Sequence, residues 1–325
     1  MGLGALVTVA VLASAVLHAS WNALAHRVPE PMAAMTLIGL GMFALSVPLL
    51  LVVPTPVVAS WRYLGASLGV HLTYVVLLAR SYRLGDFGQV YPMARGTSPL
   101  VVTLVAALFL GERLSGLGLA GVLGVCAGLA VLVWRRSGSG DAVEPAGRGS
   151  VEPVEPAGRG SVEPVEPAGR GSGGPVHPAG RVRRSRRTAA LVAAGATGLS
   201  ISAYTVVDGA GVRVAGEPLG YSVWLLAGVG LGMVCIGTVV YRRRLPSVLG
   251  GRWWMAPVGG ALSWASYALV LWAQARGALG AVAALRETSV IVAAVIGTLV
   301  FGEPFGRQRI LATVLVATGI VLINV

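Results

Sequence analysis

The chain has 325 residues, of which 55% are hydrophobic and 12% are charged, with a mean hydropathy of +0.77. A soluble protein of this composition would expose a very large apolar surface, so the soluble globular class is excluded and an integral membrane protein is predicted. The net charge of +12 comes from arginines that lie between apolar runs, so it indicates membrane topology and no nucleic-acid partner.

Long apolar segments follow one another along the whole chain. A helix needs about 20 apolar residues to cross the hydrocarbon core. Segments of that size lie at residues 3–25, 32–53, 61–79, 87–110 and 117–134, and again at 189–208, 219–241, 253–275, 279–301 and 310–325. The predicted fold class is therefore an all-α integral membrane protein with ten transmembrane helices, five in residues 1–134 and five in residues 188–325.

A different kind of sequence, residues 135–187, separates the two halves. The run Val-Glu-Pro-Ala-Gly-Arg-Gly-Ser begins at Val143, Val154 and Val165, which makes an 11-residue tandem repeat. Proline, glycine and alternating charge cannot bury a core, so this linker is predicted to be disordered. The linker is better suited to be a flexible tether between the two halves than a docking tail for a partner. Its final arginine cluster is expected to rest on anionic lipid headgroups.

The distribution of arginine predicts how the protein faces the membrane. Loops after the first, third, fifth, seventh and ninth segments, the linker included, hold most of the arginines. The loops on the other side hold only Arg62, Arg113, Arg213 and Arg276. By the positive-inside rule, the linker is cytoplasmic and both termini are outside. Because each half has an odd number of helices, the halves are predicted to be inverted-topology repeats.

One motif occurs twice and indicates an internal duplication. Arg95-Gly-Thr97-Ser98 precedes Gly111-Glu112, and Arg286-Glu287-Thr288-Ser289 precedes Gly302-Glu303, each member displaced by 191 positions. An offset of 193 pairs Tyr74 with Tyr267 and His71 with Trp264, and an offset of 183 pairs Trp21 with Tyr204 and Asn22 with Thr205. The polar motif is therefore placed at equivalent depths of two related helices.

These residues resemble the EamA-type carriers of the drug/metabolite transporter superfamily. The resemblance rests on His18-Ala-Ser-Trp21-Asn22, the Arg95-Gly-Thr-Ser-Pro run, Leu110-Gly-Glu112-Arg and their counterparts in the second half. It implies a ten-helix carrier in a bacterial inner membrane that moves amino acids, other small metabolites or drugs, often outward and driven by protons or exchange. It does not identify the substrate.

Arginine inside a membrane span is costly and therefore marks a candidate functional site. Arg95 and Arg286 are expected near the membrane centre, where they either hold an anionic substrate group or form ion pairs that lock the halves together. Polar and aromatic residues at helical spacing should face the same cavity and not lipid. The predicted substrate-binding residues are Arg95, Arg286, His18, Trp21, Asn22, His71, Tyr74, Tyr204, Trp264 and Tyr267.

Two acidic residues are candidates for proton coupling. Glu287 lies well inside a predicted span, where it either carries a proton or pairs statically with Arg95 or Arg213. Asp208 is either a second proton carrier or an interfacial residue at a helix end. Glu112 and Glu303 follow a glycine at a helix end, so they are predicted to cap helix N-termini.

Neither a cofactor nor a metal is expected. Cys126 and Cys235 lie in separate apolar segments without ligand spacing. Clustered carboxylates and an activated nucleophile are missing from the predicted spans, which disfavours an enzyme. The sequence thus predicts a secondary transporter, an exporter of a small and potentially anionic metabolite that works by alternating access. The alternative is a membrane receptor or assembly subunit.

Three glycine motifs permit close helix packing, namely Gly65-xxx-Gly69, Gly124-xxx-Gly128 and Gly228-xxx-Gly232. They leave open whether the protein is a monomer or a homodimer.

Overall fold

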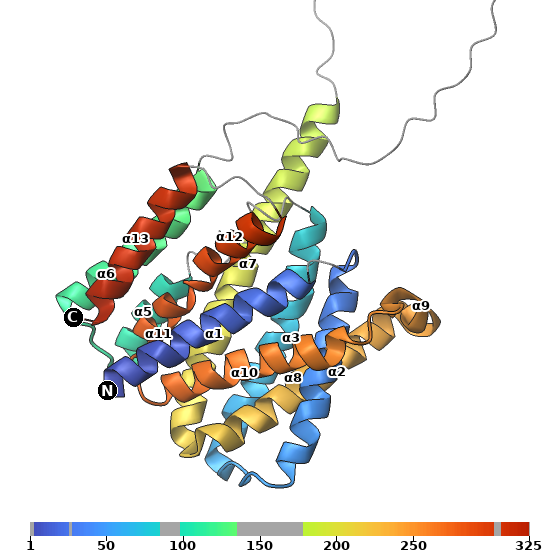
Figure 1. The fold of residues 1–325 in the computed structure, drawn as a ribbon, viewed down its shortest axis with the longest axis horizontal. Coiled ribbons are helices and arrows are strands. Elements are labelled where there is room, and N and C mark those ends of the chain that lie inside the picture. Colours follow the sequence, from blue (N-terminus) through green and yellow to red (C-terminus); the bar gives the residue numbers. More distant parts are fainter. Residues whose placement is uncertain (1–2, 26–27, 85–97, 135–177, 302–306, 325) are drawn as a thin grey trace, which may run out of the picture.

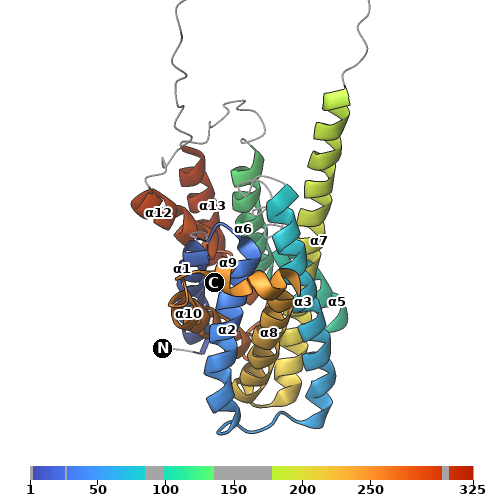
Figure 2. The same ribbon diagram turned by 90° about the vertical axis from the view of Figure 1, so that its right-hand side faces the viewer.

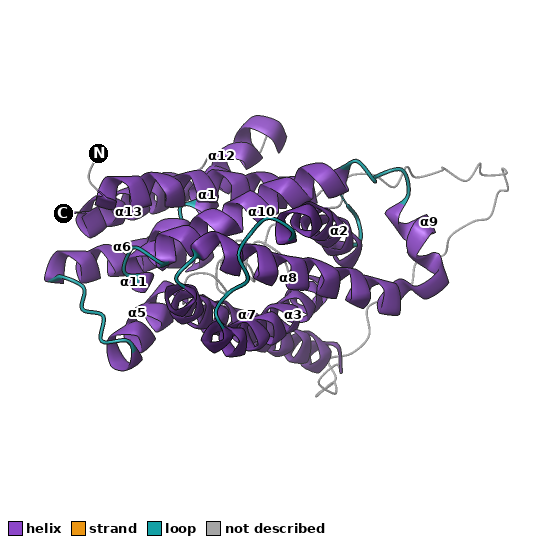
Figure 3. Cartoon of the chain, turned by 90° about the horizontal axis from the view of Figure 1, so that it is seen from below, coloured by secondary structure: helices purple, strands orange, loops and turns teal. Residues whose placement is uncertain are grey.

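The computed structural model describes residues 3–25, 28–84, 98–134, 178–301 and 307–324 (Figure 1). All regular structure in these ranges is helical (Figure 3). The longer helices are α1 (Leu3–Ala25), α2 (Pro31–Leu50), α3 (Trp61–Leu84), α5 (Ser98–Phe109), α6 (Gly116–Trp134), α7 (Pro178–Ala215), α8 (Pro218–Tyr241), α10 (Met255–Gln274), α11 (Leu279–Arg286), α12 (Ser289–Phe301) and α13 (Arg307–Asn324). The short elements are η1 (Val58–Ser60), η3 (Arg242–Arg244) and α9 (Leu245–Leu249).

The membrane class predicted from composition agrees with the helices. Four of the described helical segments are long and apolar enough to cross a bilayer, namely Gly4–Ala25, Pro31–Leu50, Pro218–Leu249 and Met255–Gln274. Shorter apolar helices lie at Ser98–Phe109, Gly116–Val131 and Ile310–Ile323. The protein is therefore an all-helical membrane protein.

Two helix boundaries differ from the sequence-based expectation. Helix α7 begins at Pro178, so residues 178–187, predicted to belong to a disordered linker, are helical. Proline suits the first turn of a helix and arginine is a good helix former, which explains the early start. The span predicted at residues 279–301 is divided into α11 and α12, with a two-residue turn at Glu287 and Thr288. The predicted span 87–110 is seen as α5 from Ser98 onward, and its earlier residues lie outside the described ranges.

Helices from the two halves of the chain pack against each other throughout (Figures 1 and 2). The most extensive packing joins α6 with α13, α2 with α8, α3 with α7, and both α1 and α2 with α10. Glycine allows the helices to approach closely, because a Cβ added at Gly121 of α6 would lie 2.6 Å from the carbonyl oxygen of Gly319 of α13. Gly124 and Gly128 face the same helix, as the sequence predicted. Gly65 and Gly69 behave differently, since nothing lies within 4 Å of a Cβ added at either.

The largest hydrophobic cluster among the described residues lies between α1, α2, α3, α7, α8 and α10, and includes Met42, Tyr204 and Leu271. This cluster surrounds the candidate site.

Candidate substrate-binding site

A central cavity of about 60 Å³ lies between helices from both halves of the chain. Helices α1, α2, α3, α7, α8, α10 and α11 each contribute to its wall. The lining residues are His18, Trp21, Met35, Ile38, Met42, His71, Tyr74, Tyr204, Leu226, Val229, Met233, Ser263, Ser266, Tyr267 and Arg286. A mostly apolar wall with a few convergent polar groups is typical of the lining of a small-molecule site, but the volume is well below that of such sites, so the cavity would have to widen to admit an organic substrate.

Most of the residues singled out from the sequence meet in this central cavity. Those that line it are His18, Trp21, His71, Tyr74, Tyr204, Tyr267 and Arg286. Two do not line it. The side-chain amide of Asn22 donates to the His18 carbonyl on the same helix at 2.7 Å, and the Trp264 indole donates to the hydroxyl of Ser46 at 2.9 Å. Arg95 lies outside the described residues. The methionines and Ser263 of the wall were missed, because apolar positions carry no distinctive signal in an apolar helix.

Aromatic rings form two groups of contacts on this wall. The His71 ring stacks on Tyr204 with 4.0 Å between ring centroids, and Tyr267 meets His71 edge-on at 5.3 Å. His18 and Trp21 are in edge contact at 5.0 Å on α1. On α3, Nδ1 of His71 lies 3.0 Å from the carbonyl oxygen of Ser67. Contacts of this kind fix the ring orientations, so the aromatic wall is preorganised.

A basic and an acidic group lie on either side of Tyr267. The guanidinium of Arg286 is 5.2 Å from the centre of the Tyr267 ring, within the range of a cation–π contact. The Tyr267 hydroxyl donates to one carboxylate oxygen of Asp208 at 2.5 Å, and the Tyr221 hydroxyl donates to the other at 3.2 Å. Asp208 is fully buried and does not line the central cavity, so it is an internal residue and not an interfacial helix end.

The repeated motif in the second half lies at the break between α11 and α12. Arg286 ends α11, Glu287 and Thr288 make the turn, and Ser289 begins α12, with every one of these residues buried. The Thr288 hydroxyl donates to the Leu285 carbonyl at 2.8 Å, which satisfies an acceptor at the end of α11. Glu287 does not line the central cavity. The break therefore separates the two neighbours, with only Arg286 facing the site.

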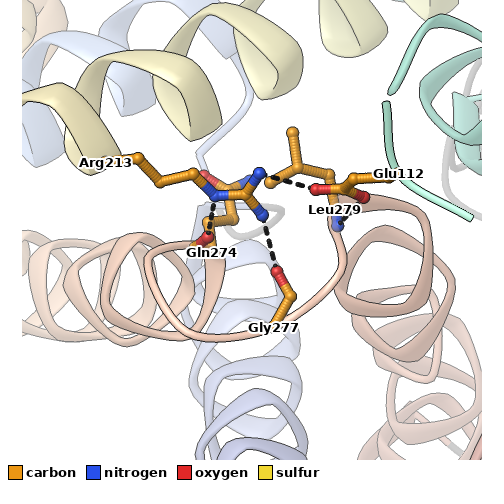
Figure 4. A network of polar contacts seen from close by, with 5 residues as sticks. All are labelled: Glu112, Arg213, Gln274, Gly277 and Leu279. Atoms are coloured by element: carbon orange, nitrogen blue, oxygen red, sulfur yellow. Dashed lines mark hydrogen bonds and ion pairs between the residues drawn. The ribbon is translucent and has the colours of Figure 1, made fainter. Parts of the chain in front are cut away.

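A polar network at one end of the bundle was not predicted as a unit (Figure 4). Arg213 forms an ion pair with Glu112 at 2.6 Å and donates to the carbonyl oxygens of Gln274 at 3.0 Å and Gly277 at 2.7 Å. The second carboxylate oxygen of Glu112 accepts from the backbone N–H of Leu279 at 2.8 Å. We call these five residues the Glu112–Arg213 network. It joins the end of α7 to the α5–α6 loop and the α10–α11 loop.

The network revises two expectations about its charges. Glu112 does cap a helix N-terminus, as predicted, but the capped helix is α11, which begins far away in sequence at Leu279. Arg213 pairs with Glu112 and not with Glu287. Glu303 lies outside the described residues. Among the residues described, no group of three histidine, cysteine or acidic side chains is placed to hold a metal ion.

Comparisons with known proteins give the fold and the family. Residues 188–325 match the model of the EamA-like transporter family. A solved structure described only as a crystal structure of a protein is similar over 98% of this chain and 95% of its own, with a TM-score of 0.65 and 18% identity, so it shares the fold. The sequence matches no curated protein. The predicted resemblance is thereby confirmed over residues 188–325, which match the EamA-like transporter family.

Proposed function

We propose that this protein is a secondary transporter that carries a small organic molecule across a bacterial inner membrane by alternating access. The observation that supports this most directly is the central cavity, whose wall is built from helices of both halves of the chain. Secondary transporters bind their substrates in this way, between two repeats and beside a discontinuous helix. The break between α11 and α12 supplies such a helix next to Arg286.

The proposed architecture is ten transmembrane helices in two inverted five-helix repeats. The 191-residue offset between the motifs at Arg95 to Ser98 and at Arg286 to Ser289 in the sequence supports it. The packing supports it as well, because α3 against α7 and α1 against α10 would be the same contact made in both repeats. Pairs such as α6 with α13 and α2 with α8 would then lie on the pseudo-twofold axis.

The proposed substrate is a small organic anion with an apolar or aromatic body. Arg286 is the one guanidinium or ammonium group among the described residues that line the central cavity, and no carboxylate lines it. A guanidinium holds carboxylate or phosphonate groups by charge-assisted hydrogen bonds. The aromatic rings and the methionine side chains of Met35, Met42 and Met233 supply an adaptable apolar surface for the rest of the molecule. Arg95 would add a second cation from the first repeat.

Proton coupling is assigned to Asp208 in preference to Glu287. Tyr267 connects the Asp208 carboxylate to the cavity wall, whereas Glu287 does not line the cavity. A substrate anion that approaches Arg286 would therefore act on Asp208 through one intervening side chain. Export, the direction that we propose, would be driven by proton entry.

Flux measurements in proteoliposomes test the proposal. Amino acids, phosphonates, aromatic carboxylates and amines are offered in turn, first in a thermal-shift screen and then as labelled substrates. We expect stabilisation and saturable flux with an anion, near-complete loss of both in Arg286→Gln and partial retention in Arg286→Lys. Arg276→Gln is the matched control, because that arginine is exposed and contacts only Trp272 among the interactions described.

Two results would contradict the proposal. An absence of flux across the whole panel, with the protein folded, would favour a receptor or assembly subunit. Stabilisation by anions that persists in Arg286→Gln would remove the anion site from this cavity.

A further inference from the structure

A second cavity, separate from the central one, lies among α2, α3 and α8 and has a volume of about 360 Å³. Its lining is apolar apart from the indole N–H groups of Trp61 and Trp224, and we call it the α2–α3–α8 pocket. The lining residues are Phe43, Leu50, Trp61, Leu64, Gly65, Leu68, Trp224, Leu225, Ala227, Gly228 and Leu231. None of them lines the central cavity.

Water is a poor occupant for this pocket. A water molecule needs two to four polar partners to stay in a cavity, and apolar cavities much smaller than this one remain dry and bind apolar molecules. The pocket also opens toward the outside of the bundle, because Trp61 and Leu231 of its wall are partly exposed. In a membrane-spanning bundle that side faces lipid. The available apolar molecule is therefore the acyl chain of a bilayer lipid.

The indole of Trp224 adds a polar requirement to the occupant. Its Nε1 atom is buried and has no hydrogen-bond acceptor within the described part of the chain. A buried donor without an acceptor is costly, so a ligand that supplies one is favoured. By contrast, Nε1 of Trp61 already donates to the Pro56 carbonyl at 3.2 Å.

The depth of Trp224 identifies the acceptor. Its ring meets that of Trp61 edge-on, with centroids 5.0 Å apart. In the proposed ten-helix topology, on which this assignment rests, Trp61, the first residue of α3, begins a membrane span and lies at the interface, where tryptophan is enriched. At that level a phospholipid carries the ester carbonyls that join its acyl chains to glycerol. From these contacts we propose that the α2–α3–α8 pocket binds one diacyl phospholipid, with an acyl chain in the pocket and an ester carbonyl accepting from Trp224.

Two glycines on α3 provide a matched pair of variants. Gly65 lines the pocket and Gly69, one helical turn later, does not. Nothing lies within 4 Å of a Cβ added at either position, so both accept a larger side chain without a backbone collision. Gly65→Leu should fill the pocket while leaving the helix in place, and Gly69→Leu should place the same side chain elsewhere on the same helix.

The experiment uses the full chain, delipidated in detergent and titrated with phosphatidylglycerol whose acyl chains carry bromine, a quencher of tryptophan fluorescence. We expect saturable quenching at about one lipid per chain in the wild type and in Gly69→Leu, and loss of the saturable component in Gly65→Leu. Equal saturable quenching in Gly65→Leu and the wild type would overturn the proposal. A dimer in the wild type that Gly65→Leu dissociates would also overturn it, because a second copy would then be the occupant.

The carbonyl contact is tested without filling the pocket. Trp224→Phe keeps an aromatic ring against Trp61 and removes the N–H, so lipid affinity should fall about three- to tenfold, as expected for one hydrogen bond. An ether-linked lipid has no ester carbonyl, so the wild type should bind it more weakly than the ester lipid by a similar factor. The wild type and Trp224→Phe should bind the ether-linked lipid with equal affinity. The comparison of ester and ether lipids needs no variant, so it remains decisive even if a substitution prevents folding. Equal affinity for both lipids would overturn the assignment of the acceptor.

Discussion

The hydroxyl of Tyr267 donates a hydrogen bond to the buried carboxylate of Asp208, with 2.5 Å between the two oxygens. The same tyrosine lines the central cavity and places its ring near the guanidinium of Arg286. One side chain thus joins the cavity wall to an acidic group behind it.

Tyr267→Phe removes that hydrogen bond and keeps the ring. Because Asp208 then loses one of its buried hydrogen-bond donors and keeps those of Tyr221 and Ser67, we expect a loss of about 1–3 kcal/mol in the free energy of unfolding. Thermal melting in detergent measures the loss, and flux at several pH values measures the effect on coupling. Tyr204→Phe is the control, since it removes a hydroxyl from the same cavity and leaves the hydrogen bonds of Asp208 intact. Equal melting of the two variants would contradict a stabilising role for the Tyr267–Asp208 contact.

Glu112→Ala removes the acceptor that holds the Leu279 backbone N–H and the partner of Arg213. The amide hydrogens at the start of α11 should therefore exchange with solvent faster, and the protein should melt at a lower temperature. Hydrogen–deuterium exchange on peptides that cover residues 275–285 measures the first effect. Arg213→Gln should give the same pattern, and the double variant should cost less than the sum of the two single changes. Additive losses would mean that the two side chains stabilise the protein independently.

Gly41→Ala tests the contact between α2 and α10. A Cβ at Gly41 would collide with the carbonyl oxygen of Ala256, a backbone atom that cannot rotate away. We expect a loss of about 1–3 kcal/mol in the free energy of unfolding from this overpacking. Gly69→Ala should be neutral or stabilising, because its Cβ meets open space and alanine is the better helix former. The two melting temperatures, measured in the same detergent, decide the outcome.

The predicted orientation of the chain is tested by labelling single cysteines. In a background with Cys126 and Cys235 replaced by alanine, Ser150→Cys lies in the linker and Thr55→Cys lies between α2 and η1. A membrane-impermeant maleimide should label Thr55→Cys on intact cells and Ser150→Cys only in inside-out vesicles. Labelling of Ser150→Cys on intact cells would reverse the predicted topology.

Periodicity explains why much of the central cavity could be predicted from sequence. Polar and aromatic residues such as His71 and Tyr74 stand out in an apolar helix, and their common stripe indicates one face. The apolar part of the wall, Met35 and Met233 for example, could not be recognised in the same way. Asn22 and Trp264 were placed in the cavity because their types suit it, but each has a nearby partner, the His18 carbonyl and the Ser46 hydroxyl, that sequence spacing does not reveal.

Two larger features required the three-dimensional structure. The polar run from Arg286 to Ser289 interrupts the apolar residues 279–301, but a polar run of this length fits the polar side of one continuous helix as well as a turn, so the turn at Glu287 and Thr288 was not predicted. The Glu112–Arg213 network joins residues from three distant segments, and the sequence shows only that Arg213 and Glu112 lie in loops predicted on the same side of the membrane. Their predicted location on the same side of the membrane is the sequence signal that favours an ion pair between them.

Helix α11 is short enough to act as a rigid rod between two sites. Its first residue, Leu279, is held by Glu112, and its last residue, Arg286, lies in the wall of the central cavity. The two ends are about 10 Å apart along the helix axis. The turn at Glu287 and Thr288 interrupts the regular helix before α12, while short-range backbone hydrogen bonds still cross it. Because Glu112 holds one end of α11 and Arg286 forms the other, we expect a displacement of the loop that carries Glu112 to move this buried cation together with the helix.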